Sequence, residues 1–88
     1  MTKKFWVYIL RTSGNTLYTG QTNNLEKRLI KHKAGKGAKY LRCFDDFKLV
    51  YLEKCGSKSE AMKREAEIKR MTKTEKEKLV WGYNKQCL

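Results

Sequence analysis

Alternating and continuous runs of hydrophobic residues predict three strands in this chain. The segment from Lys3 to Thr12 carries apolar residues on both of its alternating faces, which is typical of a strand covered on both sides. Residues Thr16 to Gln21 form a second, weaker strand, and the Ser13-Gly14-Asn15 turn between the two predicts a hairpin. Lys48 to Cys55 is predicted as the third strand.

The length of the hairpin loop decides whether two of the tyrosines share a face of the sheet. A three-residue loop opposes Thr12 to Thr16, and further along it opposes Tyr8 to Gly20. Tyr8 and Tyr18 then lie on one face as diagonal neighbours, roughly 7 to 8 Å apart at the backbone. A two-residue loop would put these tyrosines on opposite faces.

Helical periodicity predicts a first helix from about Asn24 to Ala34, with an Asn23-x-x-Glu26 pattern that resembles a capping box and with Gly35 as its terminator. At about 100° per residue, Arg28 and His32 lie one turn apart and flank the leucine stripe of this helix. Its lysines at positions 27 and 31 point away from the stripe. Two polar groups therefore sit at the margin of the face that we expect to be buried.

Two further helices are predicted in the second half of the chain. A Ser57-x-x-Glu60 capping box begins a helix that runs to about Met71. A shorter helix from Thr74 to Trp81 is expected to end at Gly82.

The resulting order is β-β-α-β-α-α, which predicts an α/β fold: a single compact domain over residues 1–88, with a three-stranded, mostly antiparallel sheet flanked by helices. A chain of 88 residues suits one domain that buries roughly 60 to 65% of its unfolded surface. No apolar run reaches about 18 residues, and the amino terminus lacks the apolar region of a signal peptide. We therefore expect a cytoplasmic protein with no membrane partner.

The charge balance indicates a polyanionic partner. Lys and Arg number 21 against 9 acidic residues, which gives a net charge of +12 and a pI near 9.8. Residues 1–42 hold ten basic residues and a single acidic one, Glu26, whereas residues 43–88 hold eleven basic and eight acidic residues. Nucleic acid is the first candidate for such a partner. The three cysteines form no C-x-x-C pair and have an odd count, which argues against a disulfide framework and a zinc site.

Glu65 lies in the middle of the apolar side of the second predicted helix. That side is marked by Ala61, Met62, Ala66 and Ile68. A carboxylate in a core-facing stripe is costly unless it is paired or bound to a cation. A salt bridge to Arg28 or to a lysine is one interpretation. The other is a ligand of Mg²⁺ or Mn²⁺, because one carboxylate with several waters suits these ions.

Several segments in this order resemble the GIY-YIG nuclease superfamily, in particular its small stand-alone bacterial members. They are WVYIL, LYTG, LEKRLIKH, GKGAKY and KREAEIK, and together they extend over nearly the whole chain. Trp6-Val7-Tyr8 replaces the Gly-Ile-Tyr of the first motif, and Thr19 replaces the isoleucine of the second. Both motif tyrosines and Gly20 match.

The resemblance implies a metal-dependent endonuclease that hydrolyses phosphodiester bonds in DNA with Mg²⁺ or Mn²⁺, with a structure-specific role in repair or recombination. It implies that either Tyr8 or Tyr18 orients or deprotonates the attacking water. Arg28 would hold the scissile phosphate, and His32 would position or shuttle a proton. Glu65 would bind the divalent ion.

Residues 35–47 show no clean period and are interpreted as a loop. For Lys36, Lys39, Tyr40 and Arg42 we expect contacts with backbone phosphates, with Tyr40 able to stack on a base. A merely solvated loop is the alternative.

Phosphodiester hydrolysis needs an activated water and stabilisation of the charge that grows on the phosphoryl oxygens. Arginine suits the second task through its fixed, always-charged fork. An unperturbed tyrosine is only about 0.1% ionised at pH 7, and lowering its pKa by about 3 units requires roughly 4 kcal/mol of preferential stabilisation of the phenolate. The alternative is that the metal or His32 activates the water and a tyrosine only positions it.

Two other functions remain open at this level. One is a non-catalytic nucleic-acid-binding module that uses the same basic surface. The other is a subunit whose activity needs a targeting protein partner, because the chain shows no appended domain that would read sequence or junction shape.

Overall fold

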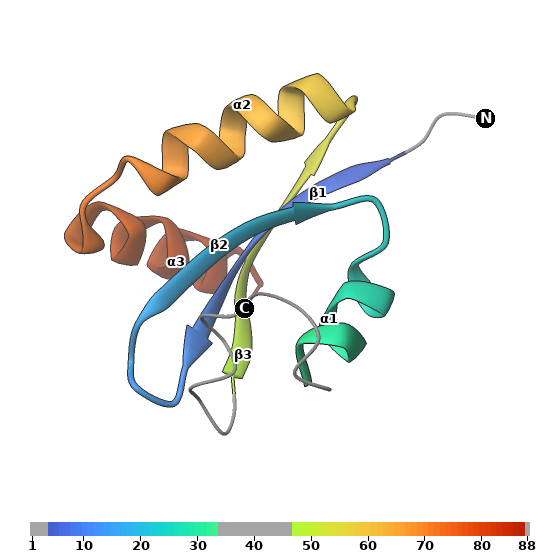
Figure 1. The fold of residues 1–88 in the computed structure, drawn as a ribbon. Coiled ribbons are helices and arrows are strands. Elements are labelled where there is room, and N and C mark those ends of the chain that lie inside the picture. The colour runs from blue at the N-terminus through green and yellow to red at the C-terminus, as the bar shows by residue number, and fades with distance from the viewer. Residues whose placement is uncertain (1–3, 34–46, 88) are drawn as a thin grey trace.

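The computed structural model describes residues 4–33 and 47–87, and the side chains up to residue 84. The predicted α/β class and element order are confirmed (Figure 1). The elements are β1 (Phe5–Thr12), β2 (Leu17–Thr22), α1 (Leu25–Lys33), β3 (Phe47–Cys55), α2 (Lys58–Lys69) and α3 (Lys73–Cys87). The four predicted nucleic-acid-binding residues Lys36, Lys39, Tyr40 and Arg42 lie outside the described residues.

The sheet has the strand order β2-β1-β3, and both pairings of β1 are antiparallel. A central strand needs apolar residues on both faces, and residues 7–10 of β1 are all fully buried, as its pattern predicted. The hairpin is confirmed, and of the two loop lengths that the sequence left open the structure has the three-residue one, because Tyr8 pairs with Gly20 and Leu10 pairs with Tyr18. Asn15 closes the turn with a φ of 61°, a left-handed conformation that asparagine tolerates.

Each face of the sheet packs against different helices. Val7 and Ile9 belong to a core that includes Ala61 and Ile68 of α2 and Val80 of α3. On the other face, the buried residues Tyr8 and Leu10 pack against partly buried side chains that include Leu25 and Leu29 of α1. Figure 1 shows α1 on one side of the twisted sheet and the α2–α3 pair on the other.

The ends of two helices differ from the prediction. Asn24, rather than Asn23, caps α1: its Oδ1 atom accepts the Lys27 backbone N–H at 3.0 Å. α3 does not end at Gly82 but continues to Cys87. An isolated glycine costs a helix only about 1 kcal/mol relative to alanine, so it does not by itself end a helix that is anchored on the core by Val80.

Fewer residues of α2 are buried than its apolar pattern predicted. Ala61 and Ile68 are fully buried, as predicted, but Met62 is 52% exposed. Ser57 caps this helix as expected, since its side chain accepts the Glu60 backbone N–H at 3.2 Å. Glu65 lies one turn after Ala61 and is therefore still on the inward side.

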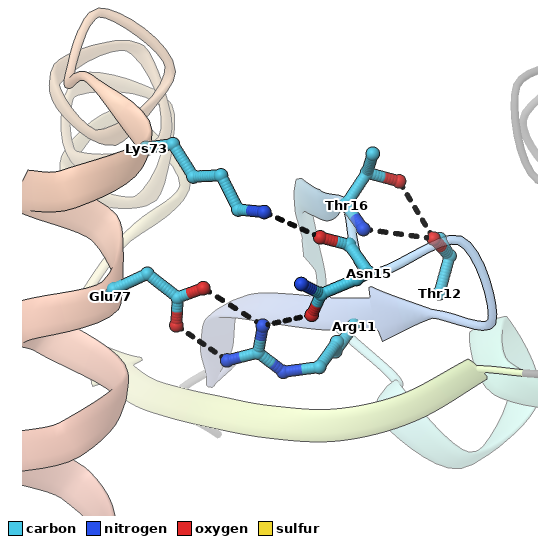
Figure 2. Close-up of polar contacts among 6 residues, drawn as sticks. All are labelled: Arg11, Thr12, Asn15, Thr16, Lys73 and Glu77. Atoms are coloured by element: carbon cyan, nitrogen blue, oxygen red, sulfur yellow. Dashed lines mark hydrogen bonds and ion pairs between the residues drawn. The ribbon is translucent and has the colours of Figure 1, made fainter.

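A polar tether fastens the β1–β2 hairpin to α3 (Figure 2). Arg11 donates through both terminal nitrogens to the carboxylate of Glu77, and its Nη1 atom also donates to Asn15 Oδ1 at 2.9 Å. Lys73 Nζ donates to the backbone carbonyl of Asn15 at 2.7 Å. These contacts hold the β1–β2 hairpin against α3, although the two are far apart in the sequence.

None of the helices in the described part of the chain is long and apolar enough to cross a membrane.

Candidate active site

Tyr8 stands at the centre of the candidate site, on the middle strand of the sheet. Its side chain is fully buried, and its hydroxyl lies 3.0 Å from His32 Nε2. The Tyr8 ring passes directly over Gly20 of the neighbouring strand, where an added Cβ atom would be 2.5 Å from the hydroxyl oxygen and 2.7 Å from Cζ. Because glycine has no Cβ, a central residue can reach across β2 towards the edge of the sheet.

His32 comes from the last turn of α1 and is enclosed by aromatic rings. The ring centroids of Tyr8, Tyr18 and Phe47 lie 6.1, 5.7 and 6.0 Å from that of His32, all in edge-on geometry. The side chain is buried, with 3% of the residue exposed, and does not lie at the margin of the buried face as expected. The helical pattern predicted which way His32 points, but how deeply it is buried depends on aromatic residues from all three strands.

Arg28 lies one turn before His32 and is half-buried. Its guanidinium lies beside the hydroxyls of Tyr8 and Tyr18, and the interaction with Tyr8 is the main cause that raises the pKa of Arg28. Its Nε atom is buried and has no hydrogen-bond partner within the described residues. A buried donor without a partner is costly in a folded protein unless water or a ligand satisfies it.

Burial sets the protonation states of the Tyr8–His32 pair. Desolvation is the largest cause that raises the pKa of Tyr8 above its ordinary value, and the nearby Arg28 opposes the rise without cancelling it. Desolvation is also the largest cause that lowers the pKa of His32, followed by the charge of Arg28. Both groups are therefore neutral at pH 7, and the direction for Tyr8 is opposite to the one that a phenolate base requires.

Glu65 approaches this cluster from α2. Its side chain is 23% exposed, and its negative charge is one of the causes that raise the pKa of Tyr8. It forms an ion pair with Lys69, one turn further along α2, with 3.6 Å between Nζ and Oε2. The expected salt bridge to a lysine is thus present, but it is long and its lysine is more than half exposed.

Four of the five predicted site residues are brought into one cluster by three elements, β1, β2 and α1. They are Tyr8, Tyr18, Arg28 and His32. Glu65 acts on the same hydroxyl electrostatically. Phe47 also contacts His32, although the sequence placed it in the loop. The one sequence feature that could have identified it is that Phe47 continues the alternation of the strand that follows.

The described residues contain no group of three or more His, Cys, Asp or Glu side chains that could hold a metal ion between them. Cys55 is a buried free thiol.

Comparison with known proteins agrees with the geometry. A family model described as the GIY-YIG catalytic domain matches residues 4–83. The chain is 50% identical over 80 residues to a UPF0213 protein of Oceanobacillus iheyensis, a match that covers 91% of this chain and 93% of the relative. A UPF0213 protein of Staphylococcus haemolyticus is 49% identical over 77 residues, with 88% and 94% covered.

A solved structure is also similar. The solution NMR structure of a UPF0213 protein from Bacillus halodurans aligns with a TM-score of 0.58 at 43% sequence identity, and the match covers 88% of this chain and 82% of that one. The family match spans the elements that carry both tyrosines, Arg28, His32 and Glu65. The chain belongs to the GIY-YIG family of nuclease domains.

Proposed function

We propose that the protein is a metal-dependent endonuclease that hydrolyses phosphodiester bonds in DNA, with structured DNA of the kind met in repair and recombination as its substrate. The observation that carries this proposal is the position of Arg28, a permanent cation beside two tyrosine hydroxyls. Its buried Nε donor has no hydrogen-bond partner among residues 4–33 and 47–87. A phosphate oxygen is the acceptor that such a donor suits.

Arg28 binds the scissile phosphate in this proposal. Its pKa is raised, so it stays charged throughout the accessible pH range. The negative charge on the phosphoryl oxygens grows during the reaction, and a fixed guanidinium stabilises the transition state more than the ground state.

The two tyrosines have different roles in this proposal. Tyr8 is fully buried and neutral, and it hydrogen-bonds to His32, so it holds the histidine and the guanidinium in place. Tyr18 is only half-buried and packs edge-on against His32, so contact with the attacking water is assigned to its hydroxyl. In this proposal neutral His32 positions the Tyr8 hydroxyl through Nε2, and the proton that leaves the attacking water passes to a neighbouring solvent water.

Glu65 is the residue that would hold the divalent ion. Glu65 is a half-buried carboxylate whose charge acts at the site, and the described residues hold no group of three or more His, Cys, Asp or Glu that could bind an ion. A single carboxylate of this kind fits Mg²⁺ or Mn²⁺, which keep several waters. When bound, such an ion supplies positive charge where the phosphoryl oxygens become more negative. The ion pair with Lys69 is weak enough to be exchanged for it.

The test is cleavage by the wild-type chain and by Glu65→Gln, with labelled single strands, duplexes, flaps and four-way junctions, with and without Mg²⁺ or Mn²⁺. We expect metal-dependent cleavage of at least one DNA by the wild type and a loss of at least about 100-fold in rate for the variant. Glu67→Gln removes a carboxylate of the same helix that faces solvent and pairs with Arg64, and it should cleave normally.

Cleavage by Glu65→Gln at the wild-type rate would remove the metal assignment. Salt-sensitive binding by the wild type without cleavage of any substrate would favour a non-catalytic binding module instead, and cleavage that appears only when a cellular protein is added would indicate a subunit that needs a targeting partner.

A further inference from the structure

A polar cavity of about 230 Å³ lies at the start of α1, next to the candidate active site. It is formed by the turn between β2 and α1 and by one side of the helix, and it is lined by Thr22, Asn23, Asn24, Lys27, Arg28 and Lys31. Three of these residues are cationic and none is acidic. The proposed catalytic roles use only Arg28 among them.

The positive charge in this cavity is not neutralised by the described part of the protein. Lys27 and Lys31 are exposed, lie one turn apart and form no ion pair there. Like charges at this spacing destabilise a helix, so the arrangement has a local cost. Glu26, the only acidic residue of the first half of the chain, lies on the other side of α1 and lines a different cavity. An anion in the basic cavity would remove the repulsion.

The turn that forms the cavity is held in place by its own hydrogen bonds. Thr22 Oγ1 accepts the Asn24 backbone N–H at 3.1 Å, and Asn24 Oδ1 accepts the Lys27 backbone N–H at 3.0 Å. The amino-terminal end of α1 therefore faces the cavity. The positive end of the helix dipole adds to the positive charge of the three cationic side chains there.

Arg28 lines this cavity and also lies beside the Tyr8 and Tyr18 hydroxyls. Anions bound on the two sides of this guanidinium would be close neighbours, as successive phosphates of one strand are. We propose that the cavity binds a second backbone phosphate of the same nucleic-acid strand, next to the phosphate that is cleaved. The claim that this phosphate neighbours the cleaved one rests on the proposed function, whereas the claim that the cavity binds a backbone phosphate does not.

A phosphate contact of this kind fixes the register of the strand but does not read its sequence. It supplies affinity that depends on salt, because each neutralised phosphate releases condensed counterions. Lys27 and Lys31 should therefore affect how tightly and in which register the strand binds.

The experiment compares Lys27→Ala/Lys31→Ala with Lys58→Ala/Lys63→Ala, a control that removes the same charge from exposed positions of α2. Both pairs are placed in the Glu65→Gln chain, so that cleavage does not interfere. Binding of a labelled single strand and a labelled duplex is titrated at several salt concentrations. At low salt we expect the chain with Lys27→Ala/Lys31→Ala to bind about tenfold more weakly. The slope of log K against log salt concentration should be smaller in magnitude by about 0.7 for the single strand and by about 0.9 for the duplex.

Equal changes in affinity and salt slope for the two pairs would overturn the inference, and cleavage by the wild type would then stand unaffected. If the Lys27→Ala/Lys31→Ala chain binds more weakly and with the smaller salt slope, but the wild type cuts no substrate, the phosphate site is supported and the proposed hydrolysis is not. Thermal unfolding checks that all chains are folded.

Discussion

The Tyr8 ring lies so close to Gly20 that it leaves no room for a Cβ atom at that position. Any side chain at position 20 would meet the hydroxyl that holds His32, so this glycine is required by a neighbour rather than by its own backbone conformation. Gly82 is the opposite case, because an added Cβ atom there meets nothing within 4 Å. The two glycines form a matched pair for substitution by alanine.

We expect Gly20→Ala to lower the free energy of unfolding by roughly 1 to 3 kcal/mol, because the Tyr8 ring must move. Gly82→Ala should raise it by about 0.5 to 1 kcal/mol, because it replaces a glycine inside α3. Urea denaturation at pH 7 measures both changes. Equal stability of Gly20→Ala and the wild type would show that the close approach is absent in solution.

Burial of His32 makes stability depend on pH. The pKa of His32 is lowered in the folded chain, so the unfolded chain takes up a proton first as the pH falls. The contribution is fully present above about pH 6.5 and is lost as the pH falls from there through the folded-state pKa.

His32→Gln, which cannot be protonated, should lose less stability than the wild type between about pH 7.5 and about pH 5. Chemical denaturation at a series of pH values measures the difference, and the carboxylates shared by the two chains largely cancel from it. Parallel pH profiles for the two chains would contradict the buried, neutral histidine.

At the scale of elements, the tether fastens the hairpin to α3, with Arg11 and Glu77 lying 66 residues apart in the sequence. The hydrogen bond from Arg11 is the main cause that lowers the pKa of Glu77. A lowered carboxyl pKa stabilises the fold at pH values above the unfolded value, and this stabilisation is lost as the pH falls through the folded one.

Glu77→Gln should lower the free energy of unfolding by about 0.5 to 1 kcal/mol at pH 7, since both partners of the pair are partly exposed. The difference from the wild type should shrink below about pH 4. Glu67→Gln is the control, because Glu67 is more exposed and its contact with Arg64 is longer, at 3.4 Å. Equal effects of the two substitutions would mean that the tether adds nothing beyond an ordinary surface pair.

The sequence predicted the existence and order of the elements well, but it predicted their ends less well. β1 was identifiable because a central strand must be apolar on both faces, and the hairpin because of its Ser13-Gly14-Asn15 turn, whereas the length of its loop was decided only by the observed pairing of Tyr8 with Gly20. The predicted end of α3 at Gly82 was wrong, because the cost of one glycine in a helix is smaller than the stabilisation from packing on the core. Exposure of Met62 depends on how α2 is rotated on the sheet, which no local pattern specifies.

For the molecule as a whole, the motif residues of the site could be named from the sequence, whereas their environments could not. Helical spacing put Arg28 and His32 one turn apart and Glu65 on the apolar side of its helix, a three-residue hairpin loop put both tyrosines on one face, and the resemblance supplied the roles proposed for them. The depth of His32 and the basic cavity beside Arg28 arise only where strands and helices meet in three dimensions. Net charge indicated a polyanion, but it could not indicate that Lys27 and Lys31 converge with Arg28 on one cavity.

Tyr8 belongs to a strand that is hydrogen-bonded along both of its edges. Segments of this kind are the last to open in a folded protein, whereas helix ends and hairpin tips fluctuate freely. The residue around which the reactive groups are arranged is thus rooted in the most persistent part of the architecture. Under the proposed function, heat should consequently abolish DNA cleavage and native structure in the same step.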